Sequence, residues 1–222
     1  MSNGIKTLFL QGPAGRLEAI FNEGAADATH AALVCHPHPL FGGTMHNKVV
    51  FHAMKTLNSF GFPVLRFNFR GAGLSEGQHD HGNGEVDDVR AGLDWLASEL
   101  RLPVIFCGFS FGAATGLRAS CPDERVVGLI SLGTPVAVEG RTYTYQFLES
   151  CSKPKLFVSG SRDQFSPQEN LERVVESVPD PKRLVLVEDA DHFFEKHLSE
   201  MQAAIHQWVE ENFRAARPAE AI

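Results

Sequence analysis

A serine flanked by glycines is the strongest chemical signal in the sequence. Ser110 lies in the run Gly108-Phe109-Ser110-Phe111-Gly112, after the apolar stretch 103–107 and before an alanine-rich stretch. Small residues beside a serine allow a sharp strand-to-helix turn, which lifts the hydroxyl above a sheet edge as a nucleophile. The following helix directs free N–H groups at negative charge formed there. The alternative is a serine that only caps a helix, because such short matches also arise by accident.

The same spacing occurs a second time, in Gly73-Leu74-Ser75-Glu76-Gly77. Ser75 lies six residues past the strand-like run that ends at Phe69, in a glycine-rich loop with no helix directly after it. This context predicts a loop residue, so Ser110 is the candidate nucleophile.

A catalytic serine needs a base, and the base needs an orienting acid; on a strand–turn–helix serine the chain order is Ser, Asp or Glu, then His. The histidines after Ser110 are His192, His197 and His206. The last two fall inside the final amphipathic helical pattern. His192 follows the last strand-like run, at the carboxyl edge where open α/β sheets bind ligands.

Asp163 is the candidate acid, because Gly160-Ser161-Arg162-Asp163 ends the preceding strand-like run at the same edge. Asp189 and Asp191 are too close in sequence to His192 to be the first choice. We expect these two to shape the loop instead.

The elements that must position these residues alternate along the chain, which predicts an α/β fold with a mostly parallel central sheet and helices on both faces. Runs 7–11 and 16–22 predict an N-terminal antiparallel hairpin. The expected strands are 31–35, 62–69, 104–109, 126–132, 155–159 and 183–187, and the expected helices are 46–59, 85–100, 112–120, 168–177 and 195–213. We expect one domain over 1–213 and a frayed tail over 214–222.

Composition and charge argue against nucleic-acid-binding, membrane-spanning and secreted classes of protein. The 222 residues carry 20 basic and 27 acidic side chains, a net charge of −7 without a basic block, which discourages nucleic-acid binding. The longest uncharged apolar-rich stretch, 102–117, is broken by Pro103 and by glycines, so no membrane span is expected. The first residues lack the pattern of a secretory signal. The 4 cysteines have no metal-site spacing and fit a reducing cytoplasm.

Ser110, Asp163 and His192, each after a successive strand, look like the triad of an α/β-hydrolase. Further blocks resemble a compact, cap-less bacterial serine esterase branch related to the dienelactone hydrolases. These blocks are His36-Pro37-His38-Pro39 with Gly42-Gly43, the run 68–75, Gly108 to Gly112, the run 160–163 and Asp191-His192-Phe193-Phe194. The resemblance covers about residues 31–210. Dienelactone hydrolases proper carry a cysteine where this chain has Ser110, which favours ordinary esters as substrates.

The resemblance implies a serine hydrolase that cleaves small carboxylic esters through an acyl-enzyme, without a cofactor. Acyl transfer also needs donors for the oxyanion, one of them the backbone N–H after the nucleophile, at Phe111. The second donor is expected in the 36–40 loop. Pro37 and Pro39 have no N–H, which leaves His38 and Leu40. By similarity to the family pattern, the donor is His38.

The gap 133–154 has room for one short helix, near 143–149, but not for a cap domain. The site is therefore expected to be shallow, with Leu40, Tyr143 and Tyr145 as candidate substrate contacts. The two tyrosines can equally serve to secure the insert. Thioesterase or peptidase activity on the same triad, and a non-catalytic α/β-hydrolase-fold binding protein, are the alternative functions. The sequence leaves the oligomeric state open.

Two clusters of potential metal ligands are assigned other roles. His36 and His38 lack a third ligand at a convincing spacing. The run His79-Asp80-His81 with Glu85, Asp87 and Asp88 is typical of a polar loop followed by the acidic start of a helix. Cys107 falls inside a strand-like run and is expected in the core. No metal is expected.

Overall fold

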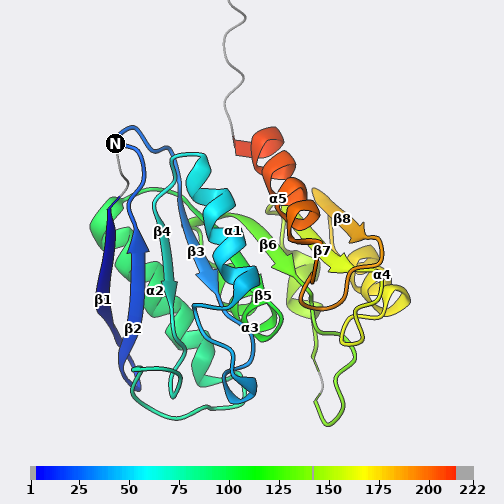
Figure 1. Ribbon diagram of the computed structural model, residues 1–222, viewed down its shortest axis with the longest axis horizontal. Coiled ribbons are helices and arrows are strands. Elements are labelled where there is room, and N and C mark those ends of the chain that lie inside the picture. Colours follow the sequence, from blue (N-terminus) through cyan, green and yellow to red (C-terminus); the bar gives the residue numbers. More distant parts are fainter. Residues whose placement is uncertain (1–3, 142, 214–222) are drawn as a thin grey trace, which may run out of the picture.

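One eight-stranded sheet organises the chain, with strand order β1-β2-β4-β3-β5-β6-β7-β8 (Figure 1). The computed structural model describes residues 4–141 and 143–213. The strands are β1 (Ile5–Gly12), β2 (Gly15–Asn22), β3 (Ala31–Cys35), β4 (Val64–Phe67), β5 (Val104–Phe109), β6 (Val126–Leu132), β7 (Lys155–Gly160) and β8 (Lys182–Val187). β2 pairs antiparallel with both β1 and β4, and the remaining pairs are parallel. The predicted N-terminal hairpin and mostly parallel sheet are confirmed.

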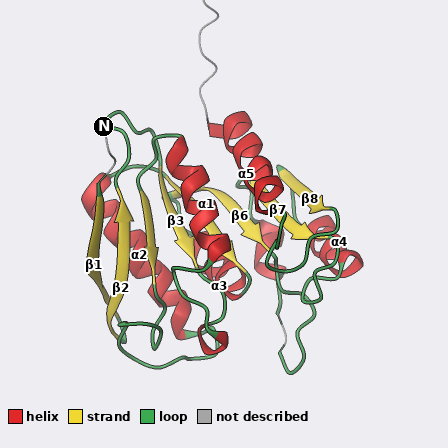
Figure 2. Ribbon diagram, in the orientation of Figure 1, coloured by secondary structure: helices red, strands yellow, loops and turns green. Residues whose placement is uncertain are grey.

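The helices cover both faces of this sheet, as predicted (Figure 2). They are α1 (Lys48–Ser59), α2 (Gly84–Leu100), α3 (Phe111–Ser120), α4 (Gln168–Ser177) and α5 (Leu198–Phe213). Residues of α1 and α5 share one core, and residues of α2, α3 and α4 share the other. Alternate residues of β5 enter opposite cores, Phe106 on the α2–α3 side and Cys107 on the α1–α5 side. Strands buried on both faces explain the uninterrupted apolar runs.

Two helices, α1 and α5, begin later than their apolar patterns predict. α1 begins at Lys48 rather than at residue 46, because the side chain of Asn47 accepts the N–H of Val49 at 2.9 Å and caps the helix. α5 begins at Leu198 rather than at residue 195, after a turn in which Phe194 and Lys196 have φ values of 52° and 67°. Positive φ interrupts a helix, so the turn keeps the chain after His192 out of α5.

In the described part of the insert between β6 and β7, the helical content is the short 3₁₀ helix η2 (Gln146–Ser150), and no cap domain is present there, as expected. This helix replaces the one expected near 143–149. The expected tail 214–222 lies outside the described residues. Within the part of the chain that the structure describes, no helix is both long and apolar enough to cross a bilayer.

The loop between β4 and α2 is held by buried carboxylates. Arg70 forms an ion pair with Asp88 at 2.7 Å, and its backbone N–H also donates to that carboxylate. Glu85, fully buried, accepts the N–H groups of Asp80 and Gly82 at 2.7 and 2.8 Å. The acidic start of α2 therefore holds this loop in place.

A buried histidine ties two strands together at the edge of the sheet where they end. His36 follows β3, and its Nε2 accepts the N–H of Phe69, just past β4, at 2.9 Å. Its Nδ1–H donates to the Pro37 carbonyl at 2.6 Å. Burial lowers the pKa of His36 from 6.5 to about 4, although the bond to Pro37 opposes the shift. If Nε2 were protonated, its N–H would face the N–H of Phe69, and the two donors would repel each other.

We expect this histidine to make the fold sensitive to acid. Between pH 6.5 and about 4 the unfolded chain binds the proton and the folded chain does not, so the free energy of unfolding falls as pH decreases. The full effect is about 3 kcal/mol. His36→Gln, whose amide oxygen can still accept the Phe69 N–H, should show a shallower slope in denaturant titrations across this range. The control His206→Gln, on the exposed side of α5, should retain the wild-type slope, and equal slopes in all three proteins would contradict the assignment.

Candidate active site

Ser110 occupies a strained turn between β5 and α3, with φ 55° and ψ −118°. Its flanking glycines make this turn possible. A Cβ on Gly108 would lie 2.5 Å from the Gly112 carbonyl oxygen, and a Cβ on Gly112 would lie 2.4 Å from the His36 carbonyl oxygen. The close approach of helix to strand therefore requires glycine at both positions. The serine hydroxyl is lifted from the end of the sheet, as the spacing predicts.

The structure brings Ser110, His192 and Asp163 together in an unbroken hydrogen-bonded chain. Ser110 Oγ lies 3.0 Å from His192 Nε2, and His192 Nδ1 lies 2.8 Å from Asp163 Oδ2. Because a carboxylate only accepts hydrogen bonds, Nδ1 must carry the proton and Nε2 is free to accept one from the serine. These side chains come from the loops after β5, β7 and β8 and meet at the carboxyl edge of the sheet.

The Asp163 carboxylate is buried but well supplied with donors. Its Oδ1 accepts the backbone N–H groups of Phe165 and Ser166 at 2.9 and 3.1 Å. Its Oδ2 accepts the Ser159 hydroxyl at 3.3 Å in addition to His192. Donors of this kind stabilise the ionised form of a carboxyl group inside a protein. They also fix the plane of the carboxylate and, through it, the imidazole.

Aromatic rings hold the imidazole of His192 from three directions. The rings of Phe109, Phe165 and Phe193 have their centroids 5.0, 4.8 and 5.2 Å from it. On a further side, a Cβ on Gly133 would lie 3.0 Å from the ring, so this position leaves space for the histidine. The ring can therefore turn little, which keeps both nitrogens on their partners.

Two backbone N–H groups are available beside the serine. Phe111 is the first residue of α3, so its N–H has no carbonyl one turn earlier in the helix to bond. In the 36–40 loop, Leu40 donates its N–H to the imidazole Nδ1 of His38 at 3.2 Å, and its side chain is 64% exposed. Pro37 and Pro39 have no backbone N–H. The N–H of His38 is therefore the remaining candidate donor of this loop.

A cavity of about 330 Å³ opens over the triad. Of the expected substrate contacts, only Tyr143 lines it. Tyr145 is buried, and its hydroxyl donates to the Pro135 carbonyl at 2.8 Å, so it secures the insert instead. Leu40 projects outside. The walls combine the start of α3, the insert and the loops after β3, β7 and β8. They include Phe41, Val138, Arg141, Phe165 and Phe193.

Some residues at this site are not apparent from the sequence. Ser159 and Phe165 support Asp163 and His192, and Arg141 and Phe41 line the cavity. Ser159 could have been recognised, because a serine in a strand-like run only four residues before the expected acid is a possible partner for that acid. Nothing in the irregular insert distinguishes Arg141 from its neighbours.

The alternative candidates have other roles. Ser75 is buried in its loop, where its hydroxyl donates to the Asn68 carbonyl at 2.6 Å and accepts the Glu18 N–H. His36 links strand ends, as described above. Among the described residues, no group of three or more histidine, cysteine or acidic side chains is arranged to hold a metal ion.

Comparison with known proteins supports the same fold. A profile of the alpha/beta hydrolase domain matches residues 31–217. A solved α/β serine hydrolase homologue from Coxiella burnetii is 35% identical, covers 93% of this chain and 97% of its own, and superposes with a TM-score of 0.84. A serine hydrolase without a lid from Xanthomonas campestris is 33% identical, with coverages of 96% and 97% and a TM-score of 0.85.

A protein of Rickettsia prowazekii without an assigned function is 32% identical over 209 residues, which cover 91% of this chain and 87% of the relative. The matching profile spans most of the sequence, from β3 to beyond α5. This chain belongs to the α/β-hydrolase domain family and resembles its lidless serine hydrolases.

Proposed function

We propose that the protein is a carboxylesterase that hydrolyses small esters through an acyl-enzyme formed on Ser110. The observation that carries the proposal is the unbroken chain from Ser110 through His192 to Asp163, at 3.0 and 2.8 Å. Each contact has the length needed for proton transfer or for orientation of the base. The free thiols of all four cysteines fit action in a reducing cytoplasm.

In the acylation step, the Ser110 oxygen attacks the ester carbonyl carbon while His192 Nε2 takes the hydroxyl proton. The carbonyl oxygen becomes an oxyanion, which the N–H groups of Phe111 and His38 stabilise. The tetrahedral intermediate collapses when its bond to the alcohol oxygen breaks, and His192 returns the proton to that oxygen. Asp163 remains ionised and stabilises the transient imidazolium.

Deacylation repeats these steps with water as the nucleophile. His192 Nε2 takes a proton from the water, whose oxygen attacks the acyl carbon. Collapse of the second tetrahedral intermediate breaks the bond to Ser110 Oγ, which recovers its proton from His192. The carboxylic acid leaves, and the resting hydrogen-bonded chain is restored.

The open cavity sets the size of the substrate. Its volume of about 330 Å³ lies at the lower end of small-molecule sites, and its walls are largely apolar near the serine. The short insert leaves the cavity beside Ser110 open to solvent. These properties favour short-chain esters of small alcohols.

Replacing the nucleophile should remove activity without unfolding the protein. Ser110→Ala should reduce hydrolysis of p-nitrophenyl acetate to background and prevent labelling by a fluorophosphonate probe, because the hydroxyl forms the covalent bond. Ser75→Ala is the matched control in the second Gly-x-Ser-x-Gly run. It should remain labelled and active, and loss of labelling in that variant alone would contradict the assignment.

The orienting role of Asp163 is tested by a change that keeps its shape. In Asp163→Asn the amide nitrogen can donate to Nδ1, which favours the wrong tautomer of His192, so kcat should fall by about 10⁴-fold. Asp189→Asn, a surface carboxylate paired with Arg162, is the control and should keep near-normal kcat. A nearly normal Asp163→Asn enzyme would show that another group orients the base.

The second oxyanion donor can be separated from its side chain. His38 has φ −56°, which suits proline, so His38→Pro removes the N–H without demanding a new backbone angle. We expect kcat to fall by about 10²–10³-fold in this variant. His38→Ala keeps the N–H and should retain substantial turnover. Circular dichroism checks both folds; equal losses in the two variants would assign the function to the imidazole, and activity in both would contradict the donor role.

A further inference from the structure

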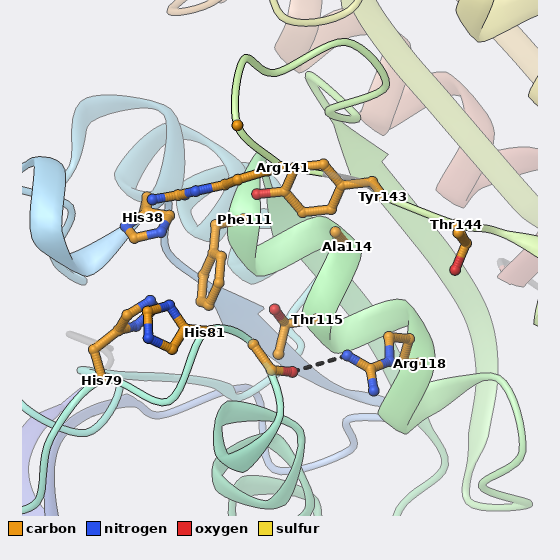
Figure 3. A pocket seen from close by; sticks show the side chains of 12 residues that line it. His38, His79, His81, Phe111, Ala114, Thr115, Arg118, Arg141, Tyr143 and Thr144 are labelled. Carbon is orange, nitrogen blue, oxygen red and sulfur yellow. Dashed lines mark hydrogen bonds between the residues drawn. The ribbon is translucent and has the colours of Figure 1, made fainter.

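A second cavity, of about 490 Å³, adjoins the triad cavity (Figure 3). His38, Phe111, Arg141 and Tyr143 line both cavities and therefore stand between them. The second cavity extends away from Ser110 along α3 and reaches the loop between β4 and α2. The two cavities are therefore neighbours separated by this shared set of side chains.

One face of α3 forms a wall of the second cavity. Phe111, Ala114, Thr115 and Arg118 line it and follow the spacing that places residues on one side of a helix. Arg118 lies eight residues beyond Ser110, or about 12 Å along the helix axis. Its Nη1 donates to the Gly82 carbonyl at 2.9 Å, which holds the guanidinium at the cavity (Figure 3). That bond uses one of the five N–H donors of the group.

The polar lining is basic. Arg118 and Arg141 reach the cavity from α3 and from the insert, and His38, His79 and His81 line it from the two other loops (Figure 3). Among the described residues that line it, none is acidic. Burial, and next the positive charge of Arg141, lower the pKa of His38 to about 3. The smaller part of this shift, due to Arg141, agrees with the basic lining of the cavity.

His79 presents a buried polar group without a matched partner. Its side chain is only 5% exposed, and its Nε2 forms no hydrogen bond. Its Nδ1 lies 2.8 Å from Glu85 Oε1 but lacks the alignment of a hydrogen bond. Glu85 is itself occupied with the loop N–H groups of Asp80 and Gly82. A buried unpaired nitrogen is costly, and a ligand in the cavity can satisfy it.

We propose that the second cavity is an anion subsite, which binds a carboxylate or phosphate carried by the ester while the scissile bond lies at Ser110. This inference rests on the proposed esterase function. Guanidinium groups suit both anions because they offer paired donors and a permanent charge. The substrate class is then an ester with an anionic group several bonds from its carbonyl.

The separation of Arg118 from Ser110 along α3 makes chain length a direct test. The p-nitrophenyl half-esters of succinic, adipic and suberic acid place a carboxylate at increasing distance on the acyl side. Neutral p-nitrophenyl esters of equal chain length are their partners. A second arm compares 4-acetoxybenzoate with its methyl ester, which places the anion on the alcohol side. Phosphate and adipate, tested as competitive inhibitors and as calorimetric ligands, distinguish the two anions.

Arg118→Gln should lower the ratio of kcat/KM for anionic over neutral esters by about tenfold in at least one arm, mainly through KM. Arg118→Lys, which keeps the charge, should restore part of the preference. Arg90→Gln is the matched control, because it removes an exposed arginine on α2 that pairs only with Asp87. It should leave the ratio unchanged.

An unchanged ratio in Arg118→Gln across both arms, together with undiminished binding of adipate and phosphate, would overturn the subsite and leave the esterase proposal intact. If the wild-type protein hydrolyses neither kind of ester, the esterase proposal fails. Calorimetry then still decides the subsite: anion binding lost in Arg118→Gln supports it, and absence of binding to the wild-type protein overturns it.

Discussion

The close approach of α3 to the ends of β5 and β3 is the constraint on which the site depends. Gly112 lies against the carbonyl of His36, and Gly108 lies against the carbonyl of Gly112, so that no side chain fits at either point. The chain can complete this turn only with Ser110 at positive φ. This close backbone contact thereby lifts the Ser110 hydroxyl from the end of the sheet. It also directs the N–H of Phe111, the first residue of α3, to the same side. The same contact fixes the start of the 36–40 loop, which carries the proposed second donor.

Hydrogen-bond partners then distinguish the two buried titratable groups at this edge of the sheet. Burial and the accepted N–H favour neutral His36, and this keeps the loop after β3 joined to the loop after β4. Asp163 is equally enclosed but faces donors on both oxygens, which suits an ionised carboxylate. Two buried titratable groups at one edge of the sheet thus have different surroundings. The difference lies in their partners rather than in their depth.

Much of this arrangement could be predicted from the sequence because the signals are local. A strand buried on both faces appears in the sequence as a continuous apolar run. A serine between glycines predicts a sharp strand-to-helix turn. Helix boundaries were less accessible, since the start of α1 depends on one side-chain cap at Asn47 and the start of α5 on positive φ values before it. The insert was the least predictable part. Tyr143 and Tyr145 are two residues apart in irregular chain, and no periodicity indicates which one faces the cavity.

The position of His192 has a consequence for how the protein loses activity. This residue follows β8, an edge strand whose residues are mostly half-buried, whereas the strand before Ser110 is buried throughout. Edge elements with less burial open in local unfolding events that cost less than global unfolding. The base can therefore leave the serine while the central sheet remains intact. We therefore expect heat inactivation to follow the opening of β8 and to precede the melting of the core.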